Sequence, residues 1–121
     1  MEVDSQLSDE TFGRRIQRLR RDLRLTQRDV ASAVDIDFTY LSKLENDRGE
    51  TPSEETVRKL AKALKTDEED LLASAGKIPP SLRDRAQKNL AFARFLRRLP
   101  GVPDNKLQDI YRELDKKPRK R

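Results

Sequence analysis

Apolar residues recur at helical spacing along almost the whole chain, and clusters of glycine and proline separate one such stretch from the next. No run shows the alternation of apolar and polar residues that is typical of a half-buried strand. The first part of the chain is therefore predicted to fold as five short helices. They are expected at about residues 9–23, 26–34, 37–45, 53–65 and 66–72. The pattern predicts an all-α protein.

Each predicted helix has an apolar stripe that can face a common core. The inward-facing residues are expected to be Phe12, Ile16, Leu19, Leu23, Val30, Ala31, Val34, Leu41, Leu44, Val57, Leu60, Ala61, Leu64, Leu71 and Leu72. Side chains that accept from free backbone N–H groups mark the helix starts. The expected caps are Ser8 or Asp9, Thr26 with Asp29, Asp37, Ser53, and Thr66 with Glu69. Gly13 is expected to cost a little helix propensity.

The C-terminal third has a different organisation. Residues 76–80 contain Gly76 and two prolines, which predicts a stiff linker. Two amphipathic helices are expected after it, at residues 81–99 and 104–114, separated by the Pro- and Gly-containing residues 100–103. The resulting units are a flexible N-terminus (1–8), a helical domain (9–75), the linker, a C-terminal helical segment (81–115) and a basic tail (116–121) that is expected to be disordered.

Composition excludes several kinds of chemistry. The 121 residues include no cysteine and no histidine, so disulfides, thiol catalysis and an ordinary zinc site are not expected. The acidic start does not look like a signal peptide, and no apolar run approaches the roughly 20 residues of a membrane helix. We therefore expect a cytoplasmic protein that is not an enzyme and needs no metal or cofactor.

Positive charge is unevenly spread. The net charge is +5, but residues 1–80 carry 14 basic and 17 acidic side chains while residues 81–121 carry 13 and 5. A basic balance favours a polyanionic partner. Within the acidic first part, residues 14–28 hold seven arginines. Arg28 and one or two arginines near Arg14 are expected to contact phosphates, and the others to be solvated or to pair with the acidic residues 67–70.

One ordered set of motifs carries the functional prediction. Residues 25–31 read LTQRDVA, residues 35–46 read DIDFTYLSKLEN, and residues 52–56 read PSEET. Together these resemble the helix-turn-helix domains of the Cro and phage C1 repressor type, also called XRE-like, over residues 12–73. The resemblance implies a five-helix, lambda-repressor-like DNA-binding domain with its motif at residues 26–45. It also implies that the third helix lies in the major groove and that Gln27 holds a phosphate.

The residues themselves support a DNA-reading third helix. Its outward face is predicted to carry Phe38, Thr39, Ser42 and Lys43. Lys43 can donate to a guanine edge, and a thymine methyl can pack on Phe38. The alternatives are that Phe38 packs back on the second helix and that Lys43 is an ordinary solvated lysine. At position 35 the family usually has glycine, and Asp35 is expected to adopt the left-handed conformation that the turn needs.

Phosphate contacts are expected on both sides of the third helix. A helix N-terminus attracts anions, and the second helix starts at such a site. The candidate phosphate-binding residues are Thr26, Gln27, Arg28, Asn46 and Arg48. Asp47 and Glu50 in the same loop are expected to oppose this contact. Glu45 is expected to pair with a basic residue inside the domain.

The C-terminal segment predicts a protein–protein contact. Its apolar residues are Phe92, Phe95, Leu96, Leu99, Leu107, Ile110 and Tyr111. A dimer interface is one interpretation, because two-fold symmetric operators are read by dimers. The alternative is that these helices fold back on their own domain.

Three functions are compatible with these features. The favoured one is a sequence-specific regulator of transcription, a repressor that binds a palindromic operator in double-stranded DNA as a homodimer. The second is an antitoxin that binds its own operator and covers a toxin with residues 81–121. The third is an adaptor that uses the same scaffold for protein contacts.

Overall fold

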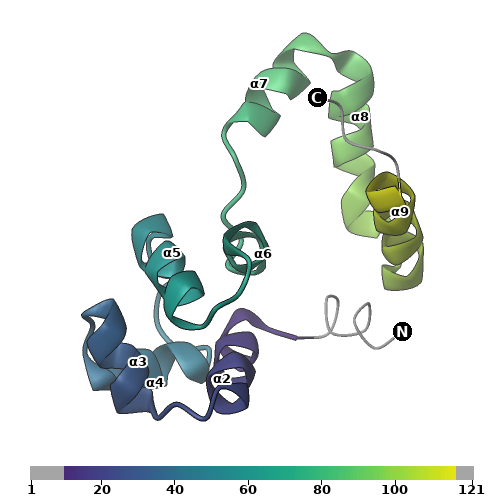
Figure 1. The fold of residues 1–121 in the computed structure, drawn as a ribbon. Helices are drawn as coiled ribbons and strands as arrows, with labels where there is room; N and C mark the ends of the chain where they lie inside the picture. Colours follow the sequence, from purple (N-terminus) through teal and green to yellow (C-terminus); the bar gives the residue numbers. More distant parts are fainter. Residues whose placement is uncertain (1–9, 117–121) are drawn as a thin grey trace. The chain divides into compact units, whose positions relative to one another are not determined.

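The computed structural model describes residues 10–116, in which eight α-helices and one 3-10 helix follow one another without a strand (Figure 1). The predicted all-α class is therefore confirmed for the described part of the chain. The described residues fall into two compact units, one of residues 10–78 and one beginning at Pro79.

The first unit contains the five predicted helices. They are α2 (Phe12–Asp22), α3 (Gln27–Val34), α4 (Phe38–Glu45), α5 (Glu54–Ala63) and α6 (Glu68–Ser74). Their apolar stripes meet in one core, in which Val57, Leu60 and Leu71 have no exposed surface. The predicted core is confirmed except for Leu23, which is half-buried and lies outside the cluster.

The predicted helix starts are confirmed at α3 and α5. The Thr26 hydroxyl accepts from the Asp29 N–H at 3.0 Å, and the Asp29 carboxylate accepts from the Thr26 N–H at 2.9 Å. Ser53 accepts from the Thr56 N–H at 3.2 Å. Asp37 lies at the N-cap of α4, but its side chain makes no capping hydrogen bond.

Two predicted caps were wrong. Thr11, not Ser8 or Asp9, caps α2, because its hydroxyl accepts from the Arg14 N–H and the helix begins only at Phe12. At α6 the cap is Asp67, whose carboxylate accepts from the Asp70 N–H. Thr66 is occupied in closing the preceding helix, since its N–H donates to the Ala61 carbonyl after Lys65 turns left-handed.

Two left-handed residues shape the loops around α4. Asp35 has φ 62° and ψ 49°, as predicted, and this conformation ends α3 three residues before α4 begins. Asp47 has φ 57° and follows α4. Its carboxylate accepts from the Gly13 N–H at 2.9 Å and from the Thr11 hydroxyl at 2.7 Å. Asp47 therefore ties the loop after α4 to the start of α2.

Gly13 has a packing role that helix propensity does not reveal. A Cβ at this position would overlap the Leu44 carbonyl oxygen and the Asp47 carboxylate. The close approach of α2 to the end of α4 therefore requires glycine at this position, a role that the propensity argument did not predict.

The second unit differs from the prediction in one respect. Its helices are α7 (Ser81–Lys88), α8 (Leu90–Arg98), the 3-10 helix η1 (Leu99–Gly101) and α9 (Asp104–Lys116). The single helix predicted at 81–99 is therefore two helices. Asn89 interrupts it with φ −142° and ψ 106°, and its side chain accepts from the Phe92 N–H at 3.0 Å as the N-cap of α8. The capping bond replaces the helical continuation that asparagine disfavours.

Two predicted segments lie outside the description. The N-terminal residues 1–9 and the tail residues 117–121 are not among the described residues. Lys116, which was expected to begin the tail, is the last residue of α9.

The close approach at Gly13 is testable. We expect Gly13→Ala to lower the free energy of unfolding of the first unit by about 1–3 kcal/mol, because the added methyl group pushes α2 away from α4. Chemical denaturation followed by circular dichroism measures this. Gly101→Ala is the control, since no atom lies within 4 Å of its Cβ position. Equal stability of the two variants would contradict the packing role.

Candidate nucleic-acid interface

The outward face of α4 carries the predicted base-reading residues. Phe38, Thr39 and Lys43 are exposed, and Ser42 is half-buried. Leu41 and Leu44 point into the core between them, with 1% and 4% of their surface exposed. The structure thus separates the two faces of α4 as the sequence predicts, which leaves the polar face free for a ligand.

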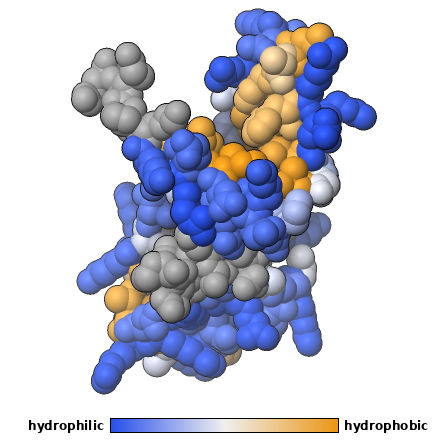
Figure 2. All heavy atoms as spheres, turned by 90° about the vertical axis from the view of Figure 1, so that its right-hand side faces the viewer, coloured by the Kyte–Doolittle hydropathy of each residue, from blue (hydrophilic) through white to orange (hydrophobic). Residues whose placement is uncertain are grey.

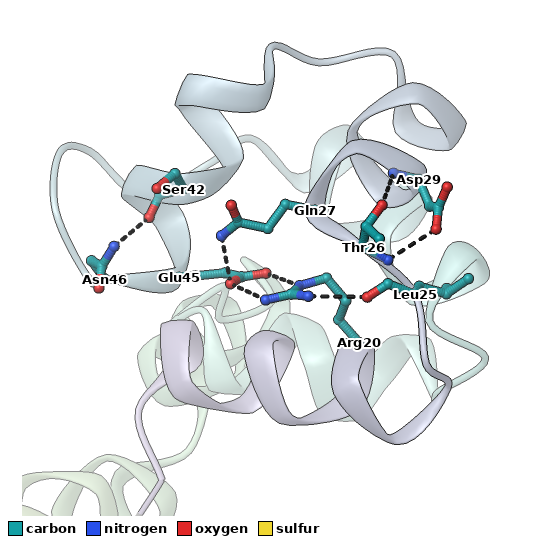
Figure 3. A network of polar contacts seen from close by, with 8 residues as sticks. All are labelled: Arg20, Leu25, Thr26, Gln27, Asp29, Ser42, Glu45 and Asn46. Atoms are coloured by element: carbon teal, nitrogen blue, oxygen red, sulfur yellow. Dashed lines mark hydrogen bonds and ion pairs between the residues drawn. The ribbon is translucent and has the colours of Figure 1, made fainter.

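A buried polar network holds α4 against α2 and α3 (Figure 3). The Arg20 guanidinium on α2 donates to both carboxylate oxygens of Glu45, at 2.6 and 2.9 Å, and to the Leu25 carbonyl at 3.0 Å. The Gln27 amide on α3 donates to the same carboxylate at 2.9 Å. Only 1% of the Glu45 side chain is exposed. The predicted structural pairing of Glu45 with a basic residue is confirmed, and that residue is Arg20.

This network also orients Gln27, the predicted phosphate ligand. Its amide nitrogen carries two hydrogens, and one of them is used by Glu45. The second remains for an external acceptor, so Glu45 fixes the direction in which Gln27 can donate. The hydrogen bonds from Arg20 to Glu45 raise the pKa of Arg20, which therefore keeps its charge inside the domain.

The N-terminus of α3 can attract an anion. The first N–H groups of a helix have no partner within it, and here the capping box of Thr26 and Asp29 uses two of the nearby donors. A hydrogen bond from the Thr26 backbone lowers the pKa of Asp29, so this carboxylate is ionised near the site. For a phosphate to bind here, the positive charge of neighbouring arginines must therefore exceed the negative charge of Asp29.

Those arginines line a shallow hollow at the start of α3. Arg21 reaches it from the end of α2 and Arg24 from the loop that follows, and Arg28 and Phe38 border it from α3 and α4. The sequence predicted further phosphate contacts near Arg14 and did not single out Arg21 and Arg24. Their position directly before the motif, three residues apart, is the signal that could have identified them as candidates.

Arg28 and Phe38 are stacked on each other. The guanidinium carbon lies 4.7 Å from the centroid of the ring, which is 41% exposed. The alternative that Phe38 packs back on the second helix is confirmed only in part, and its packing on a thymine methyl stays a prediction. The ring contacts the preceding helix through Arg28, yet it remains at the surface beside the other residues of α4.

A second shallow hollow lies at the other end of α4. Tyr40 and Lys43 line it from the helix, and Arg48 lines it from the following loop. The Arg48 N–H donates to the Lys43 carbonyl at 2.9 Å, and the Asn46 amide donates to the Ser42 carbonyl at 2.9 Å. Lys43 and Arg48 are thus brought together, although they lie on different elements. The Asp47 carboxylate is bonded to the start of α2, whereas Glu50 lines the hollow, and the expected opposition of these two acids to a phosphate stays a prediction.

Of the two outcomes expected for the other arginines, exposure to solvent is found for Arg14 and Arg21, whereas pairing with residues 67–70 was wrong. Arg18 binds Glu10 through two hydrogen bonds of 2.6 and 3.0 Å and also pairs with Asp22. This contact lowers the pKa of Glu10. Within residues 67–70, Glu68 pairs with Arg58 of α5 rather than with α2. Neighbouring acids on the same unit satisfy these arginines before the more distant acidic cluster can.

The predicted interface of the C-terminal unit is uncovered. None of the residues of α7, α8 and α9 is buried. Phe95 and Tyr111 are 46% and 51% exposed, Leu107 is also exposed, and the other predicted interface residues are half-buried. Figure 2 shows hydrophobic residues gathered in a band over the C-terminal helices, in the upper part of the view.

In the part of the chain that the structure describes, neither a metal-binding cluster nor a membrane-spanning helix is found. Residues 10–116 contain no group of three or more acidic side chains placed to hold a metal ion. Over the same range, each helix is too short or too polar to cross a lipid bilayer.

Comparison with known proteins points to one family. The profile of a helix-turn-helix domain family matches residues 13–77. The HTH-type transcriptional repressor RghR of Bacillus subtilis (strain 168) is 35% identical over 69 residues, which are 57% of this chain and 51% of that protein. An uncharacterized HTH-type transcriptional regulator of the same organism, RghRB, is 37% identical over 79 residues, or 63% and 57% of the two chains.

These similarities have a limited span. The chain covers little more than half the length of both relatives. No solved structure matches it.

The buried ion pair is testable by removing one partner. We expect Arg20→Met to lower the free energy of unfolding by about 3–5 kcal/mol, because it leaves the Glu45 carboxylate buried without a cation. Arg18→Met is the matched control on the same helix, where a partly exposed pair contributes at most about 1 kcal/mol. Urea denaturation of both variants checks this. A loss for Arg20→Met no larger than for Arg18→Met would contradict the structural role of the pair.

Proposed function

The chain belongs to the XRE-like helix-turn-helix family, and from this premise we propose that it is a transcriptional regulator that binds double-stranded DNA in a sequence-specific manner. The five-helix arrangement of α2–α6 is the lambda-repressor-like fold of such domains. A relative is named as a repressor, which favours repression for this chain as well. The observation that carries the proposal is the exposed face of α4, which is held rigidly by the Arg20–Glu45–Gln27 network.

In this proposal α4 enters the major groove and reads base edges. The groove offers donors, acceptors and the thymine methyl group to an inserted helix. Lys43 is placed to donate to a guanine, and Thr39 and Ser42 are suited to base edges of either kind. Phe38, as the first residue of α4, offers an apolar contact. These four residues are the proposed base readers.

Phosphates flank the groove and are proposed to bind at both ends of α4. At the start of α3, Gln27 offers its N–H groups and Thr26 its hydroxyl, since the Thr26 N–H is used by Asp29, and Arg21 and Arg24 lie nearby. At the other end, Asn46 and Arg48 are the proposed ligands. The sequence assigns Arg28 to the same task, but its stack on Phe38 favours a different one.

We also propose that the C-terminal unit joins two copies of the chain. The uncovered apolar residues of α8 and α9 need a cover, and a second copy supplies a matching surface. The charges agree with this pairing. α8 carries three arginines and no acidic residue, whereas α9 carries four acidic and three basic residues. An arrangement in which α8 of one copy faces α9 of the other therefore brings opposite charges together.

The second candidate is an antitoxin whose C-terminal unit covers a different protein. The same uncovered apolar band favours it, because a different protein can cover the band as well as a second copy can. A partner that lacks an arginine-rich face would also avoid charge repulsion with the basic surface of α8. The two candidates differ in the oligomeric state of the isolated protein. A stable homodimer supports the regulator, and a folded monomer supports a missing partner.

The DNA-binding proposal predicts distinct effects of two substitutions. We expect Lys43→Ala to weaken binding to the selected operator by about fivefold to 150-fold and to leave non-specific binding nearly unchanged, because base contacts specify. Gln27→Ala is expected to weaken both, since phosphate contacts do not depend on sequence. Fluorescence anisotropy with operator and scrambled duplexes measures this. Lys62→Ala on α5 is the control, and unchanged operator affinity after both substitutions together would refute the assignment of α4.

The dimer proposal predicts the effect of a charge in the apolar band. We expect Phe95→Glu to raise the dissociation constant of the homodimer at least about 30-fold, because a carboxylate at a central aromatic position cannot be desolvated. Analytical ultracentrifugation over a concentration series measures this. Gln87→Glu, an exposed change of the same charge, is the control. A wild-type chain that is monomeric at all concentrations would contradict the dimer and favour the second candidate.

A further inference from the structure

The stack of Arg28 on Phe38 joins the two helices of the motif at their exposed ends. Arg28 is the second residue of α3 and Phe38 is the first residue of α4. The guanidinium carbon lies 4.7 Å from the ring centroid, and both side chains are exposed. Side chains of a helix lean toward its N-terminus, so Phe38 projects beyond the first turn of α4. The pair therefore occupies the end of α4 that, under the proposed function, enters the groove first.

Contact with Phe38 restricts the positions that the Arg28 guanidinium can take. The guanidinium lies over the ring, and its five N–H groups form a planar fork that matches two acceptors on one edge. Arg28 makes no ion pair with any residue among 10–116, and its neighbour Asp29 is bonded to Thr26. Its donors therefore remain available, while the ring restricts the movement of the side chain.

The two side chains lie close enough together to face adjacent base pairs. Neighbouring base pairs are about 3.4 Å apart along the duplex, and the Arg28 guanidinium carbon lies 4.7 Å from the centroid of the Phe38 ring. An arginine edge fits the O6 and N7 acceptors of guanine, and an aromatic edge fits the methyl group of thymine. Each plane of the Arg28–Phe38 pair thus has a chemical counterpart on adjacent base pairs.

Phosphate contact is the competing role for Arg28. The hollow beside it already contains Arg21 and Arg24, which have no ring to restrict them, together with the first N–H groups of α3. A phosphate at this site has enough donors without Arg28. A phosphate accepts hydrogen bonds over a wide range of angles, so an arginine that is held in place by a ring gains little in binding it. A base edge accepts hydrogen bonds in a narrow range of directions, so the same restriction favours recognition of the correct base.

We propose that Arg28 and Phe38 act as one specificity element that reads a guanine next to a thymine in each half-site. Arg28 donates to the guanine O6 and N7, and Phe38 packs on the neighbouring thymine methyl. The inference rests on the proposed DNA-binding function and deepens it by naming the base step. It assigns Arg28 to base recognition and makes Phe38 both an apolar reader and the support that positions Arg28.

The test begins with selection of bound duplexes from random DNA by the full chain. The expected half-site contains guanine beside thymine. Two base analogues placed in the operator then test the guanine–thymine step. 7-Deazaguanine in place of guanine removes the N7 acceptor, and uracil in place of thymine removes only the methyl group. We expect the wild type to lose about tenfold or more in affinity with 7-deazaguanine and about threefold to fourfold with uracil.

Variants show whether the two side chains act together. Arg28→Lys keeps the charge but loses the planar donor edge, so we expect it to bind the operator about tenfold more weakly and to become insensitive to 7-deazaguanine. Phe38→Leu should reduce the sensitivity to both probes, whereas Phe38→Tyr, which keeps the ring, should retain both. Arg21→Lys is the matched control, because Arg21 lines the same hollow without a ring contact.

Each outcome decides between the alternatives. If Arg28→Lys weakens operator and scrambled duplexes equally, as expected for Arg21→Lys, Arg28 is a phosphate ligand and the inference is wrong. A consensus without the guanine–thymine step, or a wild type insensitive to both probes, overturns the inference while leaving the proposed function intact. Failure of the wild type to enrich any sequence overturns the proposed function and the inference together.

Discussion

The buried ion pair between Arg20 and Glu45 is the contact on which the arrangement of α2, α3 and α4 depends. A desolvated charge pair adds little net stability compared with a well-packed apolar pair, but its directional hydrogen bonds permit only one geometry. Here one carboxylate receives donors from Arg20 on α2 and Gln27 on α3 while it lies at the end of α4. The position of the exposed face of α4 is therefore fixed by a bond inside the domain.

Close contact between α2 and the end of α4 reinforces this constraint. Gly13 leaves room for the Leu44 carbonyl, and Asp47 accepts from the start of α2. The same contact directs the Asp47 carboxylate toward the start of α2, although Asp47 itself stays exposed. The buried ion pair has a clearer electrostatic effect, because it keeps the Glu45 carboxylate, which would repel a polyanion, away from the surface. The positive charge that matters is local, although residues 1–80 are acidic overall.

The two units of the chain satisfy their apolar residues in different ways. The five helices of the first unit bury theirs in a common core, whereas α7, α8 and α9 have no buried residue and leave theirs exposed or half-buried. A helical segment with a strong apolar stripe and no buried residue needs a further surface to cover it. In the proposed regulator, the two units therefore have different roles: the first unit recognises DNA, and the second joins two copies of the chain.

Local patterns in the sequence determined the helices of the first unit, its core, and the caps of α3 and α5, such as Thr26 with Asp29. They also predicted the outward face of α4 and the left-handed Asp35. Tertiary structure decided which of the seven arginines meets Glu45, why position 13 is glycine, and that Arg28 stacks on Phe38. Arg20 and Glu45 are 25 residues apart, and Gly13 and Asp47 are 34 apart. Helical periodicity constrains neighbours within one or two turns, and only the packing of whole helices brings such distant side chains into contact.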